Sequence, residues 1–321
     1  MGEKMANDNI RAASGILSQM QSEIGKVLLG KEDVVRKVLI SFAAGGHVLL
    51  EDIPGVGKTT LALALAKATD LKFSRLQFTP DVVPSDITGF TVYRKETGDF
   101  VYREGAAMTN ILLADEINRT SSKTQSALLE VMQENAMTVD GDRHEVPQPF
   151  FVIATENPAS AVGVQHLPEA ELDRFMMRLS IGYPDAGSEI RMMKERGASD
   201  PISAVRRVAT ARVLIAIRQI AAGVYADDKI LKYIRDLSQA TRDSEMVTLG
   251  VSPRGSLALL ACARAAALFD GRDYTVPEDI ADVFIDCAAH RIRVAPGAVV
   301  KGMTPENVLE GILKNVKPEV M

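Results

Sequence analysis

The stretch that decides the fold is DIPGVGKTT, residues 52–60. The apolar run HVLL (47–50) precedes it, and LALALAKAT (61–69), a segment rich in Ala and Leu, follows it. The sequence therefore predicts a buried strand, a glycine-rich turn and a helix, in that order. Gly55 and Gly57 let backbone N–H groups converge on an anion at the start of this helix, where the helix dipole also favours negative charge. The stretch is thus typical of a phosphate-binding loop.

Side chains in this loop have candidate roles. Lys58 is expected to reach the outer phosphates of a nucleotide, and the hydroxyl of Thr59 is a suitable ligand for magnesium. Asp52 stands where the motif usually has its first glycine. We expect its carboxylate to turn away and accept backbone hydrogen bonds, because a carboxylate aimed at the phosphates would repel them. The other members of the predicted nucleotide-binding set are Gly55, Val56, Gly57 and Thr60. The alternative is a glycine-rich turn with an incidental lysine.

Two later apolar runs end in polar side chains suited to nucleotide hydrolysis. NILLADE (110–116) ends in two adjacent carboxylates, at the carboxyl end of a predicted parallel strand. There Asp115 would hold magnesium through water, and Glu116 would polarise the water that attacks the terminal phosphate. FFVIATEN (150–157) ends in Asn157, an amide able to orient that water or the departing phosphate. The simpler interpretations are a strand end with a helix cap for the acidic pair and a turn-forming or buried side chain for the asparagine.

The whole chain is predicted to form two domains. Apolar runs at 73–78 and 176–183 continue the alternation with helix-like segments, which favours an α/β core with a parallel sheet and helices on both faces. After residue 184 we expect no further strands. Helices are predicted instead at 187–196, 207–222, 227–241, 253–270, 277–290 and 304–315. We therefore assign residues 1–190 to the core, with an N-terminal helix, and residues 191–321 to a small all-α domain.

Two intervals inside the core have the pattern of β-hairpins. TVYRKETGDFVYREG (91–105) pairs two β-rich runs across a Thr-Gly turn, and MTVDGDRHEVP (137–147) does so across an Asp-Gly turn. We expect each hairpin to be inserted into the α/β core.

Composition limits the classes of partner and compartment. The 321 residues carry a net charge of −5, so there is no bulk positive field for nucleic acid, and this argues against a nucleic-acid partner. No stretch of about 18 uncharged apolar residues occurs, and Cys262 and Cys287 lie in apolar helical patterns, so a soluble protein in the reducing cytoplasm is expected. Four histidines are scattered and are predicted to be structural or surface groups: His47, His144, His166 and His290.

Taken together, these motifs resemble the AAA+ ATPases, and the surrounding sequence is similar to one branch of them, the MoxR family. The most specific segments are LQFTPDVVPSDITG (76–89) and INRTSSKTQSALLEVMQE (117–134). LPEAELDRFMMR (167–178) and VSPRGSLALLACARAAAL (251–268) extend the resemblance, which covers most of residues 27–290. It implies a P-loop core followed by a helical lid, with ATP and Mg²⁺ bound and ATP hydrolysed.

The resemblance also implies roles for several arginines whose function cannot be inferred from their side-chain chemistry alone. Arg174 in LDRF matches the arginine finger, which would stabilise transition-state charge on a neighbouring subunit's ATP. Arg254 in SPR matches sensor 2, which would reach the phosphates of its own subunit. Arg178 and Arg119 are alternatives for the finger. Without the resemblance these arginines would be interpreted as solvated or salt-bridged surface groups.

Three further implications follow from the family. Residues 79–105 would be the helix-2 insert and 137–146 the hairpin before sensor 1. Backbone around Leu29 and Gly30 would frame the adenine. A finger supplied by a neighbour requires a homo-oligomer, which the family resemblance implies to be a ring of six.

The resemblance favours a chaperone-like function, in which ATP hydrolysis remodels or matures a partner protein, often one with a von Willebrand factor A domain. Two alternatives remain open at this point. The first is a nucleic-acid motor, and the second is a chelatase-like ATPase subunit or another nucleotide enzyme such as a small-molecule kinase.

Overall fold

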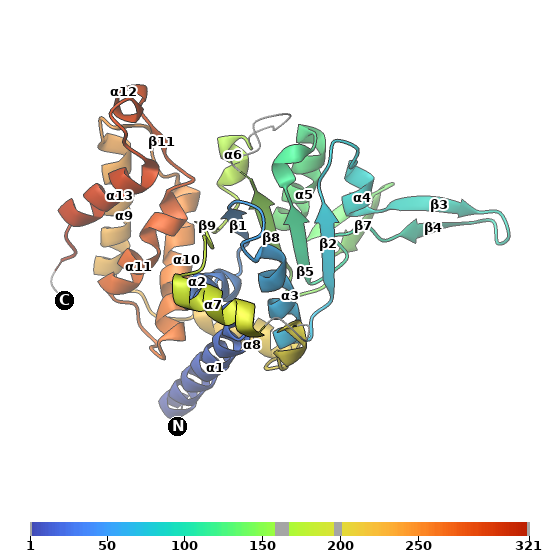
Figure 1. The fold of residues 1–321 in the computed structure, drawn as a ribbon, viewed down its shortest axis with the longest axis horizontal. Coiled ribbons are helices and arrows are strands. Elements are labelled where there is room, and N and C mark those ends of the chain that lie inside the picture. The colour runs from blue at the N-terminus through green and yellow to red at the C-terminus, as the bar shows by residue number, and fades with distance from the viewer. Residues whose placement is uncertain (1, 158–166, 196–200, 320–321) are drawn as a thin grey trace.

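The structure is a computed structural model that describes residues 2–157, 167–195 and 201–319, and a five-stranded parallel sheet forms its centre (Figure 1). The strands lie side by side in the order β2 (Phe73–Gln77), β5 (Ile111–Asp115), β8 (Phe151–Glu156), β1 (Val48–Glu51) and β9 (Met177–Leu179). Each neighbouring pair is parallel. The predicted core strands are therefore confirmed. The carboxyl ends of β5, β8 and β1 lie side by side at one edge of the sheet.

Both faces of this sheet are covered by helices, as predicted. Side chains alternate along each strand, so Val48 and Leu50 belong to one hydrophobic cluster and Leu49 to the other. The first cluster includes residues of α1 (Gly2–Gly25), α2 (Glu32–Ala43) and α3 (Lys58–Thr69). The second includes residues of α4 (Pro84–Thr88) and α5 (Ser122–Glu134). A central parallel sheet buried in this way accounts for the nearly continuous apolar strands of the sequence.

Two antiparallel hairpins interrupt the α/β alternation, as predicted. The first joins β3 (Phe90–Arg94) to β4 (Asp99–Arg103) and projects far from the sheet (Figure 1). The second joins β6 (Ala136–Val139) to β7 (Asp142–Glu145) through Asp140 and Gly141, which both have positive φ as a tight hairpin turn requires. The ring of Tyr102 stacks on that of His144 at 3.9 Å between centroids, so the two hairpins touch.

The part of the chain after the sheet is mainly helical. Its α-helices are α7 (Ala186–Glu195), α8 (Ala211–Ala222), α9 (Asp228–Asp243), α10 (Pro253–Phe269), α11 (Pro277–Ala288), α12 (Pro296–Val299) and α13 (Pro305–Asn315). The six predicted helices are thus confirmed with shifted ends, and residue 196, the predicted end of the first, lies outside the described residues.

One correction concerns the expectation that this part is entirely helical. A short antiparallel pair joins β10 (Val247–Leu249) to β11 (Arg293–Val294). Strands of two or three residues are too short to show an alternating pattern, so they were missed. The boundary at residue 190 stays a prediction, because one hydrophobic cluster includes side chains from both sides of it.

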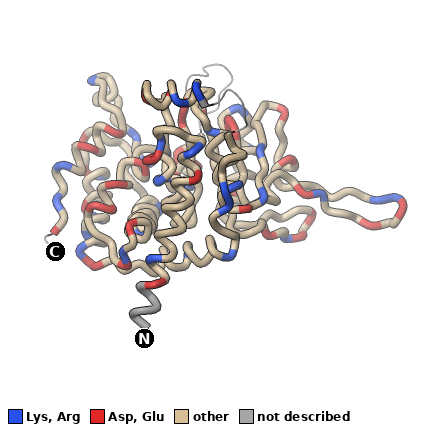
Figure 2. The backbone as a smooth tube through the Cα atoms, turned by 60° about the horizontal axis from the view of Figure 1, so that its bottom comes forward, with Lys and Arg blue, Asp and Glu red and all other residues tan. Residues whose placement is uncertain are grey.

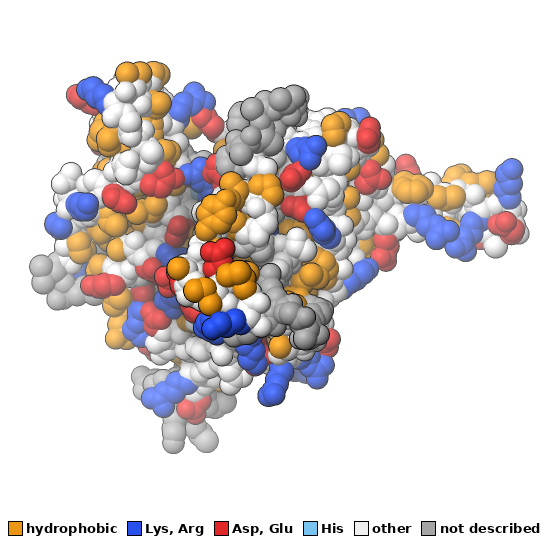
Figure 3. All heavy atoms as spheres, in the orientation of Figure 1, with side chains coloured by type: hydrophobic (Ala, Val, Ile, Leu, Met, Phe, Trp, Pro, Cys, Tyr) orange, Lys and Arg blue, Asp and Glu red, His pale blue; other side chains and the backbone are white. Residues whose placement is uncertain are grey.

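The surface of the described residues carries mixed charge. Figure 2 shows Lys and Arg interspersed with Asp and Glu over both parts of the backbone. Hydrophobic side chains gather along one edge of the projecting hairpin in Figure 3, and its exposed residues include Phe90, Tyr93 and Phe100. Within the described part of the chain, no helix has the length and apolar character needed to span a membrane.

Candidate nucleotide site

The loop between β1 and α3 has the backbone of an anion-binding turn. Gly55 and Gly57 have φ of +87° and +104°, a conformation that residues with a Cβ rarely adopt. Gly57 is the N-cap of α3, so the helix begins at Lys58. The ammonium of Lys58 lies beneath the loop and donates a hydrogen bond of 2.8 Å to the carbonyl oxygen of Asp52. The turn thus presents the start of a helix and a buried cation at one place.

The carboxylate of Asp52 points away from the loop, as predicted. Its Oδ2 accepts hydrogen bonds from the backbone N–H groups of Ile181 and Gly182 and from the hydroxyl of Ser180. These three residues follow strand β9, which lies beside β1. Asp52 therefore ties the exit of β1 to that of its neighbour and does not oppose an anion in the loop.

The two carboxylates at the end of β5 lie at the same edge of the sheet. Asp115 accepts a hydrogen bond of 2.7 Å from Thr155 at Oδ1 and one of 2.7 Å from Arg75 at Oδ2. Glu116 has φ of +58°, an uncommon conformation for a residue other than glycine, and its Oε2 pairs with Arg119 at 2.7 Å. Such backbone strain concentrates at functional sites and costs about 1–3 kcal/mol.

These groups surround one hollow of about 360 Å³. Its lining residues come from the loop, β2 and β5, and they are Pro54, Gly55, Gly57, Lys58, Thr59, Thr60, Arg75, Gln77, Asp115 and Glu116. Burial lowers the pKa of Lys58, and this effect is opposed by the negative charges of Asp115, Asp52 and Glu116. The hollow therefore combines a cation, backbone N–H groups and oxygen ligands, a donor set that suits phosphates and a hard divalent ion.

A smaller hollow of about 70 Å³ lies behind the loop. Its walls are largely apolar and include Leu29, Val56 and Met192. Gly30 has φ of +70°, and a Cβ there would lie 2.4 Å from the hydroxyl oxygen of Ser188. The turn at Leu29 and Gly30 is therefore held closely against α7, next to the phosphate hollow.

None of the four predicted arginines lines the phosphate hollow, although Arg119 pairs with Glu116, which does. Arg174 donates hydrogen bonds to Leu129 O and Gln133 Oε1 of α5. Arg254 is exposed in the first turn of α10. Arg178 pairs with Glu51 and Glu306. Asn157 directly follows β8 at the carboxyl edge of the sheet and is half-buried. The hollow thus gathers the loop and the acidic pair, whereas its described lining includes neither Asn157 nor an arginine of this group.

Comparisons with known proteins agree with this arrangement. Residues 47–177 match the family described as "ATPase family associated with various cellular activities (AAA)", and residues 239–312 match an AAA lid domain. Chaperone MoxR1 of Mycobacterium tuberculosis is 38% identical over 303 residues, which cover 92% of this chain and 80% of that protein. The chain belongs to the MoxR family of AAA+ ATPases.

Two further matches of this MoxR-family protein extend over nearly the whole chain. The uncharacterized protein YeaC of Bacillus subtilis is 45% identical over 305 residues, 95% of each chain. A crystal structure of a candidate ATPase from Cytophaga hutchinsonii superposes with a TM-score of 0.92 at 35% identity and covers 100% of both chains. We call residues 239–312 the lid from here on.

Sequence reasoning missed three residues of the MoxR-family site. Arg75 and Gln77 line the hollow from β2, and Thr155 bonds both the carboxylate of Asp115 and, at 2.9 Å, the backbone N–H of Glu116. Arg75 and Gln77 alternate on a strand, which is a signal for one polar face. That signal does not say which strand lies next to β5, so the contact could not be found without the fold.

Glu156 is a further acidic residue at this edge of the sheet, next to Asn157, and it is not among the residues that line the hollow. It lies opposite Glu51 on the neighbouring strands β8 and β1. Burial raises the pKa of Glu156 to about 7, with a further contribution from Glu51. Its Oε1 is buried and has no hydrogen-bond partner among the described residues.

The three histidines in the described part of the chain do not line the hollow of this MoxR-family protein. His47 and His290 are buried and contact backbone groups through their ring nitrogens, which confirms a structural role. His144 stacks on Tyr102, and His166 lies outside the described residues.

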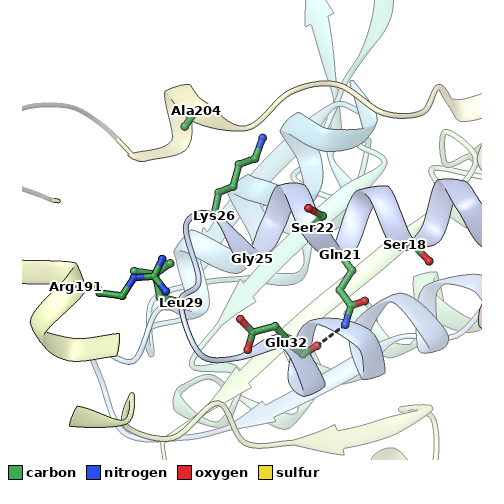
Figure 4. Close-up of a pocket in the computed structure, with 9 residues that line it drawn as sticks. All are labelled: Ser18, Gln21, Ser22, Gly25, Lys26, Leu29, Glu32, Arg191 and Ala204. Atoms are coloured by element: carbon green, nitrogen blue, oxygen red, sulfur yellow. Dashed lines mark hydrogen bonds between the residues drawn. The ribbon is translucent and has the colours of Figure 1, made fainter. Parts of the chain in front are cut away.

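A wider hollow of about 640 Å³ lies beside the site (Figure 4). It is bounded by α1, the start of α2, α7 and the short helix η2 (Pro201–Ala204). Its lining includes Lys26, Glu32 and Arg191, and Leu29 is the one described residue that it shares with the small hollow behind the loop. Since its lining includes none of the loop glycines or the acidic pair, it lacks the groups that suit a phosphate, despite its size.

Proposed function

We propose that this MoxR-family protein binds ATP with Mg²⁺, hydrolyses it in a head-to-tail ring of six subunits, and uses the energy to remodel a partner protein. The observation that carries this proposal is the convergence of Lys58, Thr59, Asp115 and Glu116 on one hollow at the sheet edge. These side chains come from two separate segments of the sequence and are the set that phosphoryl transfer requires.

Each group in the hollow has a proposed task. The backbone of the glycine loop and the ammonium of Lys58 bind the phosphates, while Thr59 and Asp115 hold the Mg²⁺. Magnesium, when bound, would neutralise part of the phosphate charge. Glu116 orients and polarises the attacking water, and Asn157 assists at the neighbouring strand end. Arg75 and Arg119, which pair with the two carboxylates, are each 47% exposed in their side chains, so their ion pairs are weak and readily exchanged.

Arg174 and Arg254 are proposed to act on the nucleotide of a neighbouring subunit. Ser252, two residues before Arg254, donates a hydrogen bond of 2.8 Å to Asp173, which directly precedes Arg174. This contact keeps the loop of Arg174 beside the first turn of α10. It supports a common task for the two arginines, whereas the family resemblance implied that Arg254 serves its own subunit.

The remodelled partner is proposed to be a protein, as in a chaperone, and within this class a von Willebrand factor A domain protein. The projecting hairpin supports a protein client because Phe100 is 75% exposed and Tyr93 and Phe90 are each 52% exposed. Exposed aromatic side chains are typical of sites that bind proteins. The interspersed charge in Figure 2 disfavours a surface that binds nucleic acid.

Nucleotide binding and turnover of two variants test the ATPase assignment. We expect Lys58→Ala to lose nucleotide binding, because it removes the cation of the hollow. Glu116→Gln should bind ATP normally and hydrolyse it at least about 100-fold more slowly, because it removes the base. Asp70→Asn is the matched control, since the carboxylate of Asp70 lies on the surface and pairs with the exposed Arg207. Wild-type nucleotide affinity of Lys58→Ala would refute the loop assignment.

The same variants identify the client. Glu116→Gln loaded with ATP in extract of the native organism should retain the client, and Lys58→Ala should not. Mass spectrometry of the retained material should find a von Willebrand factor A protein. Retention of nucleic acid, or of chelatase subunits, would instead favour one of the two alternative functions.

A further inference from the structure

The loop that carries Arg174 is attached to the lid through Asp173. The carboxylate of Asp173 accepts a hydrogen bond of 2.6 Å from Arg291 Nε at Oδ1 and one of 2.8 Å from Ser252 Oγ at Oδ2. Both donors belong to the lid. One carboxylate thus joins the start of α10 and the segment after α11 to the segment between α6 (Glu169–Leu172) and β9.

The guanidinium of Arg291 also holds the backbone of this loop. Only 2% of the Arg291 side chain is exposed. Its Nη atoms donate to the carbonyl oxygens of Asp173 at 3.1 Å, Phe175 at 2.6 Å and Met176 at 3.1 Å. His290, the preceding residue, contacts the carbonyl of Phe175 at 3.0 Å. Charge-assisted bonds of this kind are strong when buried, so the loop follows the lid at several points.

The first turn of α10 packs closely on the side chain of Arg291. A Cβ at Gly255 would lie 2.8 Å from Arg291 Cδ and 2.7 Å from Val251 Cγ1. Arg291 therefore lies between the turn that carries Arg254 and the loop that carries Arg174. A shift of the lid would displace both arginines together.

The contact between Arg174 and helix α5 of the core differs from the contacts that hold its loop to the lid. The side chain of Arg174 bonds Leu129 O and Gln133 Oε1 of α5, and its Nε is buried with no partner in the part of the chain that the structure describes. An arginine with an unused buried donor is incompletely satisfied in this position. Its side chain can therefore leave α5 at lower cost than its backbone can leave the lid.

We infer that Asp173 is a positioning residue that fixes the loop of Arg174 to the lid, which carries Arg254. The two arginines then move as one unit, and the lid of one subunit sets the rate at its neighbour's nucleotide. This inference rests on the proposed function, specifically on the action of Arg174 across the subunit interface. Asp173 itself is not among the residues that line the phosphate hollow. It acts by holding the loop through Arg291 and Ser252.

The test uses Asp173→Asn, which keeps the shape of the side chain and removes its charge. Misplacing a catalytic group by about 1 Å costs up to roughly 100-fold in rate. We expect kcat for ATP to fall at least about tenfold, with KM and nucleotide affinity unchanged because the subunit's own hollow is intact. Ser252→Ala removes one of the two bonds and should lower kcat less. Asp70→Asn is the surface control.

Rings assembled from two different variants then show whether Asp173 and Arg174 affect the site of the neighbouring subunit or that of their own subunit. Asp173→Asn is mixed with Glu116→Gln, whose own finger is intact, and Arg174→Ala is mixed with Glu116→Gln in parallel. About a quarter of the interfaces in a random mixture should pair an intact site with an intact finger, because the two sides of a heterologous interface are drawn independently. Both mixtures should therefore regain turnover.

The other outcomes overturn the inference in distinguishable ways. Wild-type kcat of Asp173→Asn, or recovery with Arg174→Ala but not with Asp173→Asn, refutes the positioning role and leaves the proposed function intact. Failure of both mixtures, with mixed rings verified by native mass spectrometry, refutes the action of Arg174 on a neighbour and the inference with it. If Asp173→Asn does not fold, Ser252→Ala is judged by the same criteria.

Discussion

At the scale of single residues, the ionisation of Glu156, at the carboxyl edge of the sheet, makes the stability of the fold depend on pH. Burial raises its pKa from 4.5 to about 7, so the folded protein favours the protonated carboxyl. The stabilising contribution of this group is therefore complete below about pH 4.5 and is lost as the pH rises towards 7. Over that window the change is at most about 3 kcal/mol.

Glu156→Gln tests this dependence, because glutamine has the same shape and no charge. We expect the variant to be more stable than the wild type at pH 8, and this advantage to disappear near pH 4.5. Urea unfolding of both proteins at the two pH values measures the difference in their free energies of unfolding. An advantage of equal size at both pH values would show that ionisation of Glu156 is not the cause.

At the scale of elements, the projecting hairpin depends on a close approach of backbones at its base. A Cβ at Gly105 would lie 2.3 Å from both Gly89 N and Ile87 O. We expect Gly105→Ala to destabilise the base by about 1–3 kcal/mol and to speed proteolysis of residues 90–104. Limited proteolysis and thermal unfolding measure both effects.

Gly15→Ala is the matched control for this substitution. Gly15 lies within α1, and a Cβ there would meet no atom within 4 Å. Because alanine is a better helix former than glycine, the control should raise stability by roughly 0.5–1 kcal/mol. Unchanged protease sensitivity of Gly105→Ala would mean that the base of the hairpin can relax around a methyl group.

At the scale of the whole molecule, the proposed action of Arg174 on a nucleotide calls for a second copy of the chain, because Arg174 is not among the residues that line the phosphate hollow. We expect Glu116→Gln to form a closed ring of six subunits when ATP is bound, because the neighbour's arginines then complete each site. Light scattering coupled to size-exclusion chromatography, with and without ATP, measures the assembly. A protein that stays monomeric at all concentrations with ATP would exclude an arginine supplied by a neighbour.

The sequence predicted most of the fold and the centre of the site, and its misses have a common cause. The phosphate loop and the acidic pair were found because each is one short segment whose function depends on adjacent residues. β10 and β11 were missed because their pairing joins residues more than 40 positions apart and each strand is too short for a pattern. The contact of Arg75 with Asp115 was missed for a related reason, since it depends on the order of strands in the sheet.

By itself, the sequence determined the local chemistry of this protein: a strand, a glycine turn and a helix with Lys58 and Thr59, followed by strands that end in Asp115, Glu116 and Asn157. Only the tertiary structure decided which of these groups share a hollow, where Asp52 directs its carboxylate, and that Arg291 joins the loop of Arg174 to the lid. Local sequence patterns determine the structure of single segments. A contact such as that of Asp173 with Arg291 joins residues 118 positions apart, so it exists only when the whole core has packed.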